Sequence, residues 1–213
     1  ISASLMPLSE VIKVPPVWFA PAKYSLANYV EVLGRIGFTL FFRNSVFVAV
    51  AITAAQLLTS CMAGFAFARY NFPGRTAIFV IILSTMMIPF QVIMIPLFIM
   101  MARLHMVNTY WGLIIPAVVS PYGIFMMRQF MLSIPSELLD AARIDGAGEF
   151  RIFWQIALPL TTPALSALSI FTFLGNWEEF LWPLIVSSSS AIRTLPVGLQ
   201  GFAEQYGTNT HWQ

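Results

Sequence analysis

Long segments without charged side chains constrain this chain more than any other feature of its sequence. Three such segments cover residues 44–68, 76–102 and 106–127, and a fourth, at 159–186, is interrupted only by a pair of glutamates. A helix needs about 20 apolar residues to cross the ~30 Å hydrocarbon core, and its backbone groups must be paired within the helix. The sequence therefore predicts an all-α membrane protein, a polytopic helical bundle with four spans in this chain.

The low charge content supports this prediction. Only 9% of the 213 residues are charged, whereas a soluble domain carries roughly 25%. Such a composition excludes a disordered chain, a nucleic-acid-binding surface and an ordinary soluble enzyme, and membrane lipid is the expected surrounding. One cysteine and two histidines exclude a Cys/His zinc site, and the sequence contains no Walker-type phosphate loop.

Prolines and small residues predict how the spans pack. Pro89 and Pro96 lie seven residues apart in the second segment, and Pro116 and Pro121 interrupt the third. Two interpretations of these prolines stay open, kinked helix packing and a flexible gate. Small residues in the first segment predict a close helix–helix contact, either within this chain or with a partner. They are Ala49, Ala51, Ala54, Ala55, Ser60, Ala63, Gly64, Ala66 and Ala68.

The chain divides into an N-terminal segment, residues 1–42, and a membrane-spanning domain, residues 43–213. In the first part, three prolines at positions 15, 16 and 21 forbid a long helix, and Ser25 is suited to cap a short helix that ends near Gly34. The short loops on the side of the 129–158 segment carry five arginines, against two on the opposite side. Positive charge favours the cytoplasmic side. We therefore expect residues 129–158 to be a cytoplasmic loop and residues 1–42 to be periplasmic.

The cytoplasmic loop has the pattern of two short amphipathic helices joined at Gly146. Pro135 suits the first turn of the first helix, and four residues recur at helical spacing on one face: Leu138, Ala141, Ala142 and Asp145. The second helix repeats this spacing with Phe150, Phe153, Trp154 and Ala157. Gly146 is expected to end the first helix with a positive φ. This arrangement predicts a docking surface for a cytoplasmic protein; a helix lying on lipid is the alternative, which the acidic residues Glu137 and Asp140 disfavour.

The spacing Asp140-Ala141-Ala142, Gly146, Ile156 and Leu158-Pro159 resembles the EAA loop of ATP-binding-cassette (ABC) importer permeases, in which the usual first residue is Glu. In that family the loop docks into a cleft of the ATPase subunit. Further segments resemble the carbohydrate-uptake branch, the MalG-like maltose-permease type, and the resemblance extends from about Tyr24 to the end. These segments are Asn44-Ser45, Thr85–Pro89, Asn108–Tyr110, Arg128–Phe130, Phe180–Leu184 and Arg193–Gly198.

The resemblance implies a set of partners and coupling residues. The partners would be an ABC ATPase dimer, a second homologous permease subunit and a periplasmic or lipid-anchored solute-binding protein in the bacterial inner membrane. ATP and Mg would be bound by the ATPase, with no cofactor and no catalysis in this chain. Six spans are usual in the family, so one more is expected before residue 1 and one after residue 213. The implied ATPase-coupling residues are Glu137, Asp140, Ala141, Ala142, Asp145, Gly146, Ile156, Leu158 and Pro159.

Two glutamates inside the fourth segment are candidate substrate contacts. Glu178 and Glu179 lie near the periplasmic interface if the span begins at Pro159, and with Asn176 and Trp177 they could line a translocation path. The alternative is a pair of interfacial acids in an aromatic belt.

The function that the resemblance implies is a permease subunit for import of a sugar or oligosaccharide. Glycerol phosphate and other polyols are alternative substrates within this class. An ion-coupled secondary transporter or channel is the alternative of another class, for which the sequence offers neither midplane charges nor inverted repeats.

Overall fold

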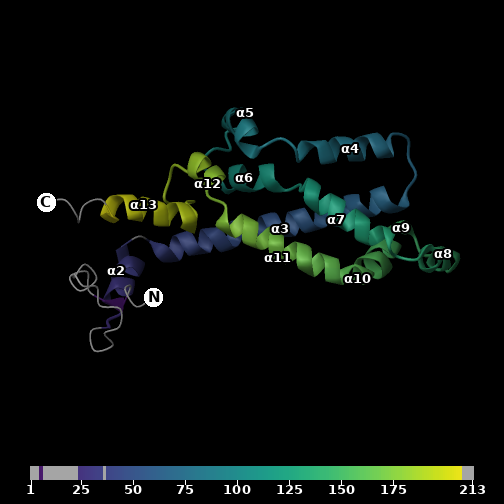
Figure 1. Ribbon diagram of the computed structural model, residues 1–213, viewed down its shortest axis with the longest axis horizontal. Helices are drawn as coiled ribbons and strands as arrows, with labels where there is room; N and C mark the ends of the chain where they lie inside the picture. Colours follow the sequence, from purple (N-terminus) through teal and green to yellow (C-terminus); the bar gives the residue numbers. More distant parts are fainter. Residues whose placement is uncertain (1–4, 7–23, 36, 208–213) are drawn as a thin grey trace, which may run out of the picture.

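The computed structural model describes residues 5–6, 24–35 and 37–207, and every regular element within these ranges is helical. The three prolines at positions 15, 16 and 21 lie outside the described residues. The short N-terminal helix α2 (Ala27–Arg35) begins after Ser25, whose hydroxyl accepts a hydrogen bond from the Ala27 N–H at 3.1 Å. Figure 1 shows an elongated bundle, with α2 and α13 (Leu195–Gly207) near one end and α8 (Ser136–Ile144) at the other.

The first predicted span corresponds to α3 (Phe38–Arg69), which begins before Arg43 and has a mean hydropathy of 2.0 in its most apolar part. Two helices, α7 (Pro121–Leu132) and α11 (Thr162–Glu178), run along α3 and form its main packing partners (Figure 1). Buried residues occur from one end of α3 to the other. This helix is therefore the central element of the bundle.

Small residues bring α3 and α7 into close contact. A Cβ atom added to Gly64 would lie 2.8 Å from the Met127 Cβ and 2.9 Å from the Arg128 backbone nitrogen. On the opposite helix, Gly123 faces the Ser60 hydroxyl in the same way. The close contact predicted from the small residues of the first span is thus made, at Ser60 and Gly64, within this chain.

The second predicted span is not one continuous helix. It is divided into α4 (Arg75–Thr85) and α5 (Phe90–Arg103), whose axes differ in direction by 98°. Pro89 stands at the start of α5, and a proline disfavours helical backbone at the residue before it. Pro96 lies inside α5. The bend predicted for this segment is therefore a turn of nearly a right angle between α4 and α5, with Pro89 at the start of α5.

The third predicted span is also interrupted, as its prolines predict. α6 (Tyr110–Ile114) continues into the short 3₁₀ turn η3 (Ile115–Ala117), and α7 follows at an angle of 43°. The Ser120 hydroxyl caps α7 by accepting a hydrogen bond from the Gly123 N–H at 3.1 Å, and Pro121 occupies the first turn. Proline suits that position because its missing N–H would have no helical partner.

The fourth predicted span differs from the expected range 159–186. The chain before it forms α9 (Glu149–Ile152), a π-helical turn η4 (Phe153–Ala157) and α10 (Leu158–Leu160), which meet α11 at an angle of 78°. At the other end, α11 stops at Glu178, and a separate helix α12 (Leu181–Val186) follows. The predicted segment therefore comprises several helices rather than one.

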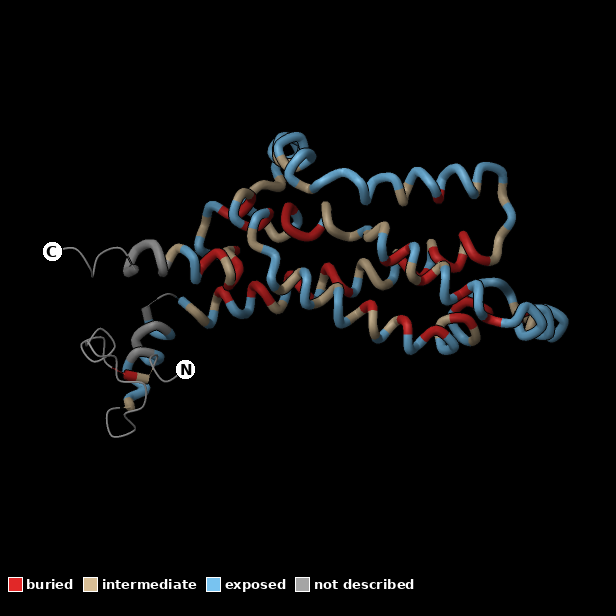
Figure 2. Tube along the Cα trace, viewed as in Figure 1, coloured by how far each residue is buried: buried red, intermediate tan, exposed pale blue. Residues whose placement is uncertain are grey.

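Within the described residues, α3 is the one helix long and apolar enough to cross a bilayer, and the number rises to four when each bent pair counts as one span. Many large apolar residues of α4, of α5 and of the turn between them are exposed, among them Ile81, Met87 and Ile95. Figure 2 shows the segment from α4 to α5 mostly in the colour of exposed residues. Lipid-facing surfaces have this character because hydrocarbon does not penalise exposed apolar groups. The burial pattern agrees with the predicted polytopic helical membrane protein.

Candidate docking surface and translocation cavity

The loop between α7 and α11 projects from one end of the bundle (Figure 1). α8 ends at Ile144, and Gly146 has a φ of +81°, in the left-handed region that favours glycine. The Ala147 N–H donates to the Ala142 carbonyl at 2.9 Å across this turn. A helix end with such a glycine and backward bond is a common C-terminal cap. The structure agrees with the two helices predicted on either side of Gly146.

The face of α8 that packs on the bundle is centred on Leu139, which lies outside the stripe that the spacing picked out. Leu139 is 1% exposed and belongs to the core around Met131 and Ile152, and Ala142 packs partly against the same core. Leu138 is 47% exposed, and Ala141 and Asp145 are also exposed. The predicted stripe is therefore divided, with Ala142 turned toward the bundle and its other members turned outward.

The predicted stripe of the second helix is divided in the same manner. Phe153 and Ala157 are buried in the core, whereas Phe150 is 74% exposed and contacts Trp154 edge to face at 6.1 Å between ring centres. Ile144, which the sequence analysis did not select, is 87% exposed at the end of α8. The helical spacing of apolar residues did not point to Ile144, because this residue lies outside both predicted stripes.

We call five of the exposed residues of this loop the docking surface: Leu138, Ala141, Ile144, Asp145 and Phe150. The three large apolar side chains among them lie on a polar loop outside the long apolar helices. Exposed apolar groups in such a setting mark interaction sites. The predicted coupling residue Glu137 is also exposed, in the first turn of α8.

Three charged side chains and one tyrosine form a network that connects α8, the start of α9 and the end of α3. Arg143 pairs with Asp140 at 2.7 Å, through Nη1, and with Glu149 at 2.8 Å, through Nε. The hydroxyl of Tyr70, at the end of α3, donates to the second carboxylate oxygen of Glu149 at 2.8 Å. Asp140 thus has a basic partner within its own chain, which the sequence analysis did not foresee.

The electrostatic effects of this network follow from its hydrogen bonds. The hydrogen bond from Arg143 holds the pKa of the Glu149 carboxyl below its usual value, and the bonds to Glu149 and Asp140 raise the pKa of Arg143. Burial, followed by the hydrogen bond to Glu149, raises the pKa of Tyr70 to about 12. All three groups therefore keep the protonation states that the network needs at neutral pH.

The last three predicted coupling residues lie farther from the docking surface. Ile156, in the π-helical turn η4, and Leu158, at the start of α10, pack partly against the bundle core. Pro159 is exposed in the first turn of α10. These residues connect the loop to α11 and do not form the outer surface of the loop.

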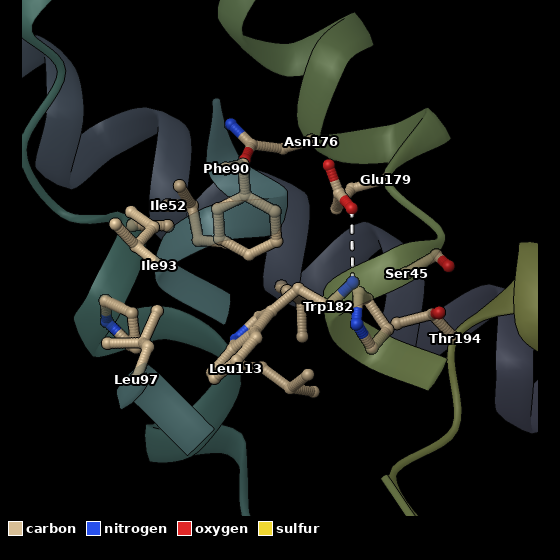
Figure 3. Close-up of a pocket in the computed structure, with 14 residues that line it drawn as sticks. Ser45, Ile52, Phe90, Ile93, Leu97, Leu113, Asn176, Glu179, Trp182 and Thr194 are labelled. Carbon is tan, nitrogen blue, oxygen red and sulfur yellow. Dashed lines mark hydrogen bonds between the residues drawn. The ribbon is translucent and has the colours of Figure 1, made fainter. Parts of the chain in front are cut away.

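A cavity of about 250 Å³ lies toward the other end of the bundle (Figure 3). Its wall is largely apolar, with Ile52 from α3, Ile93 and Leu97 from α5, and Leu113 from α6. The polar groups at its edge include Asn176 and Glu179, which face it from the end of α11. Mostly apolar walls with a few polar groups are typical of small-molecule sites.

A second hollow of about 320 Å³ adjoins this cavity and shares Asn176 and Glu179 with it. Its other polar groups include Gln56 and Tyr122. Glu179 also accepts a hydrogen bond from the Trp182 backbone N–H at 3.2 Å, drawn as a dashed line in Figure 3. Two of the four predicted path residues therefore border both hollows.

The other two predicted path residues point elsewhere. Trp177 packs against Phe42 of α3, edge to face at 5.5 Å between ring centres, and against Phe173 of its own helix. Glu178 is exposed and lines neither hollow. Adjacent residues on a helix point in directions about 100° apart, so the two glutamates face different surroundings.

Several scattered sequence segments meet at the cavity end of α3. The buried Asn44 donates to the carbonyls of Ala191 at 2.9 Å and Arg193 at 3.0 Å, and accepts from the Tyr110 hydroxyl at 2.7 Å. Next to it, the Ser45 hydroxyl accepts from the Leu195 N–H at 2.8 Å. These contacts fix the cavity end of α3 against α6 and the start of α13.

Comparisons with known proteins agree with this architecture. Residues 56–211 match the family model described as "Binding-protein-dependent transport system inner membrane component". The arabinooligosaccharides transport system permease protein AraQ of Halalkalibacterium halodurans is 42% identical over 98% of this chain and 76% of its own length. The sn-glycerol-3-phosphate transport system permease protein UgpE of Yersinia enterocolitica is 38% identical over 82% of this chain and 62% of its own length.

A solved structure shares the fold. A chain of a bacterial ABC transporter involved in the import of the acidic polysaccharide alginate superposes with a TM-score of 0.85, at 23% identity, over 100% of this chain and 73% of that chain. The family match excludes an independent ion-coupled transporter or channel. The chain belongs to the family of binding-protein-dependent transport system inner membrane components and is a permease subunit of an ABC importer, a transport component rather than an enzyme.

Proposed function

We propose that this subunit imports a neutral oligosaccharide, of the arabinooligosaccharide class, by coupling ATPase closure to a rocking motion of the helices around the cavity. The observation that carries the coupling part is the docking surface, an exposed apolar patch on a loop braced by Arg143. Its two helices form a compact surface that fits a cleft in a partner. We expect this end of the bundle to face the cytoplasm and residues 1–42 to face the periplasm.

The partners in this proposal are an ATPase dimer, a second homologous permease subunit and a solute-binding protein in the bacterial inner membrane. The ATPase holds ATP and Mg, and the permease chain supplies no cofactor. ATP closes the two ATPase subunits, and the docked loop moves with them. The helices then change the side from which the cavity is open. A bound sugar shifts this equilibrium only if it prefers one of the two states.

The cavity supports a neutral substrate. Among the described residues that line the two hollows there is no lysine or arginine, whereas Asn176, Gln56 and Glu179 offer polar groups for hydroxyls. A phosphate site normally uses basic side chains. Relatives named for arabinooligosaccharide transport also match 97% or more of this chain at 42–43% identity. Glycerol phosphate is therefore the less favoured substrate.

A matched pair of leucine variants tests the docking part of the proposal. Leu138 is 47% exposed on the docking surface, and Leu104, directly after α5 and outside the loop, is 53% exposed. Leu138→Glu places a charge in the interface and should weaken ATPase binding by about 2 kcal/mol, roughly thirtyfold. The measurement is the amount of ATPase subunit recovered with the tagged permease from membranes of its host.

Leu104→Glu introduces the same charge and should leave ATPase recovery at the parental level. Equal recovery with both variants would show that the ATPase docks elsewhere.

For the substrate, uptake of labelled arabinotriose and of labelled sn-glycerol 3-phosphate is compared in cells that carry the parent or lack the gene. Gene-dependent uptake of glycerol phosphate alone would contradict the assignment of a neutral sugar.

A further inference from the structure

We infer that α3 is the mechanical link between the docking surface and the cavity, and that Tyr70 is the positioning residue that ties the loop to this helix. The inference rests on the proposed docking of an ATPase to the loop. It concerns how movement of the loop reaches a cavity at the other end of the bundle. Hydrogen bonds at both ends of α3 support this role.

The loop is fastened to the end of α3 at two separate places. The Arg69 guanidinium donates to the carbonyls of Met131 and Ile134, where α7 leads into α8. The neighbouring Tyr70 donates to Glu149 at 2.8 Å, where α9 begins after the turn. Since these attachments lie before and after α8, the helix cannot move relative to α3 without breaking one of them.

The two helices of the loop are also fastened to each other. Arg143 on α8 bonds to Glu149 through Nε at 2.8 Å and through Nη2 at 3.3 Å. Two parallel bonds between guanidinium and carboxylate fix direction as well as distance. Glu149 therefore receives Arg143 from one side and Tyr70 from the other, and connects α8 to α3.

The opposite end of α3 forms part of the cavity wall. Ser45, Val48 and Ile52 line the cavity and recur at helical spacing on one face of α3. Ser45 stands about 36 Å along the axis from Arg69, the last residue of α3, at 1.5 Å per residue, and Tyr70 follows Arg69 directly. Because the helix between them is continuous, a displacement at Tyr70 is carried to the cavity wall without a hinge.

The bonding pattern assigns different roles to the two arginines of the loop. Arg143 takes part in the connection to α3, whereas Arg151 donates its Nε hydrogen to Gln155, four residues along the same segment, at 2.8 Å. Both arginines are exposed and both lie in the loop. Arg151 is therefore a matched control for Arg143.

The experiment follows the cavity from a single cysteine while the ATPase is driven through its cycle. Ile93, on the cavity wall, is replaced by cysteine after Cys61→Ala, and the assembled complex is purified from its host. The rate of thiol labelling is measured without nucleotide and with ATP plus vanadate. In the parent, trapping the ATPase changes the labelling rate. ATPase recovery and ATP hydrolysis are recorded in parallel.

Tyr70→Phe deletes one hydroxyl and keeps the ring that packs on Phe65. We expect ATPase recovery and hydrolysis at parental levels, with the nucleotide-driven change in labelling reduced by about three- to tenfold, a typical size for a substitution along a coupling network. Arg143→Gln should act in the same direction, and Arg151→Gln should not. Tyr70→Phe added to Glu149→Ala should have no further effect, because Glu149→Ala alone removes both bonds.

The outcomes separate the link from the docking proposal. A parental labelling response in Tyr70→Phe would overturn the role of Tyr70. The same holds if the response falls only in proportion to lost ATPase, since that result describes a purely structural residue. No nucleotide response in the parent, or no ATPase in the purified complex, would contradict the proposed function itself.

Discussion

Gly64→Ala is a direct test of the close packing between α3 and α7. The added Cβ would lie 2.8 Å from the Met127 Cβ and 2.9 Å from the Arg128 backbone nitrogen. Neither atom is the free end of a flexible side chain, so relief requires movement of a helix. Overpacking of this kind costs about 1–3 kcal/mol, and with rigid neighbours we expect the upper half of that range.

An opposing effect reduces the net loss of stability in Gly64→Ala. Alanine favours the helix interior over glycine by about 1 kcal/mol. The net destabilisation is then about 1–2 kcal/mol, which for a chain of this size lowers the melting temperature by about 2–8 °C. The assay is thermal denaturation of the purified complex in detergent, followed by the loss of the monodisperse species on size exclusion.

The control is Gly175→Ala, in the last turn of α11, where no heavy atom would lie within 4 Å of the added Cβ. This variant should be as stable as the parent or slightly more stable. If Gly64→Ala melts at or above the temperature of Gly175→Ala, the two helices do not approach as closely as described here. In that case the small residues of α3 would need another explanation.

Three further predictions concern the loop and the ends of α3. Gly146→Val should destabilise the complex by about 1–2 kcal/mol and lower ATPase recovery, because φ is +81° there; Gly148→Val, at a φ of −71°, should not. Asn44→Ala should lower stability by about 2–3 kcal/mol in the same melting assay, since its buried partners lose their bonds. Tyr70 should titrate near pH 12, seen as phenolate absorbance missing from Tyr70→Phe; its stabilising bond to Glu149 is present below pH 10.0 and is lost as pH rises through about 12.

The positions at which the apolar segments are interrupted could be predicted from the sequence, but the angles between the resulting helices could not. Prolines marked the interruptions at Pro89, Pro116 and Pro121, because a missing N–H and a fixed φ act locally. The angles of 98° and 43° depend on what each helix packs against, which no local pattern contains. The end of α11 at Glu178 had no proline or glycine signal beside it, so the fourth span was drawn too long.

The same distinction applies to the loop. Gly146 and the two flanking helices were readable from residue types and spacing. The face of α8 that packs on the bundle could not be predicted. Leu138 and Leu139 are adjacent leucines, and periodicity alone does not say which of them faces the bundle. Leu139 is buried in the same core as Ile134, whose carbonyl accepts a hydrogen bond from Arg69, and this contact exists only in the fold. The bond from Tyr70 to Glu149 joins residues far apart in sequence and could be found only in the fold.

The glutamate pair illustrates why neighbouring residues need not share a role. In sequence, Glu178 and Glu179 form one acidic unit in an apolar segment. In the fold, α11 ends at Glu178, and the backbone of Glu179 turns toward α12, with φ −59° and ψ 123°. Because the φ of Glu179 is still helical, its side chain points about 100° away from that of Glu178, and of these two exposed glutamates only Glu179 lines the cavity edge. The extended ψ of Glu179 redirects the chain after it into α12, where the Trp182 N–H donates to the Glu179 carboxylate at 3.2 Å, so the break brings a hydrogen-bond donor from α12 to the carboxylate at the proposed sugar site.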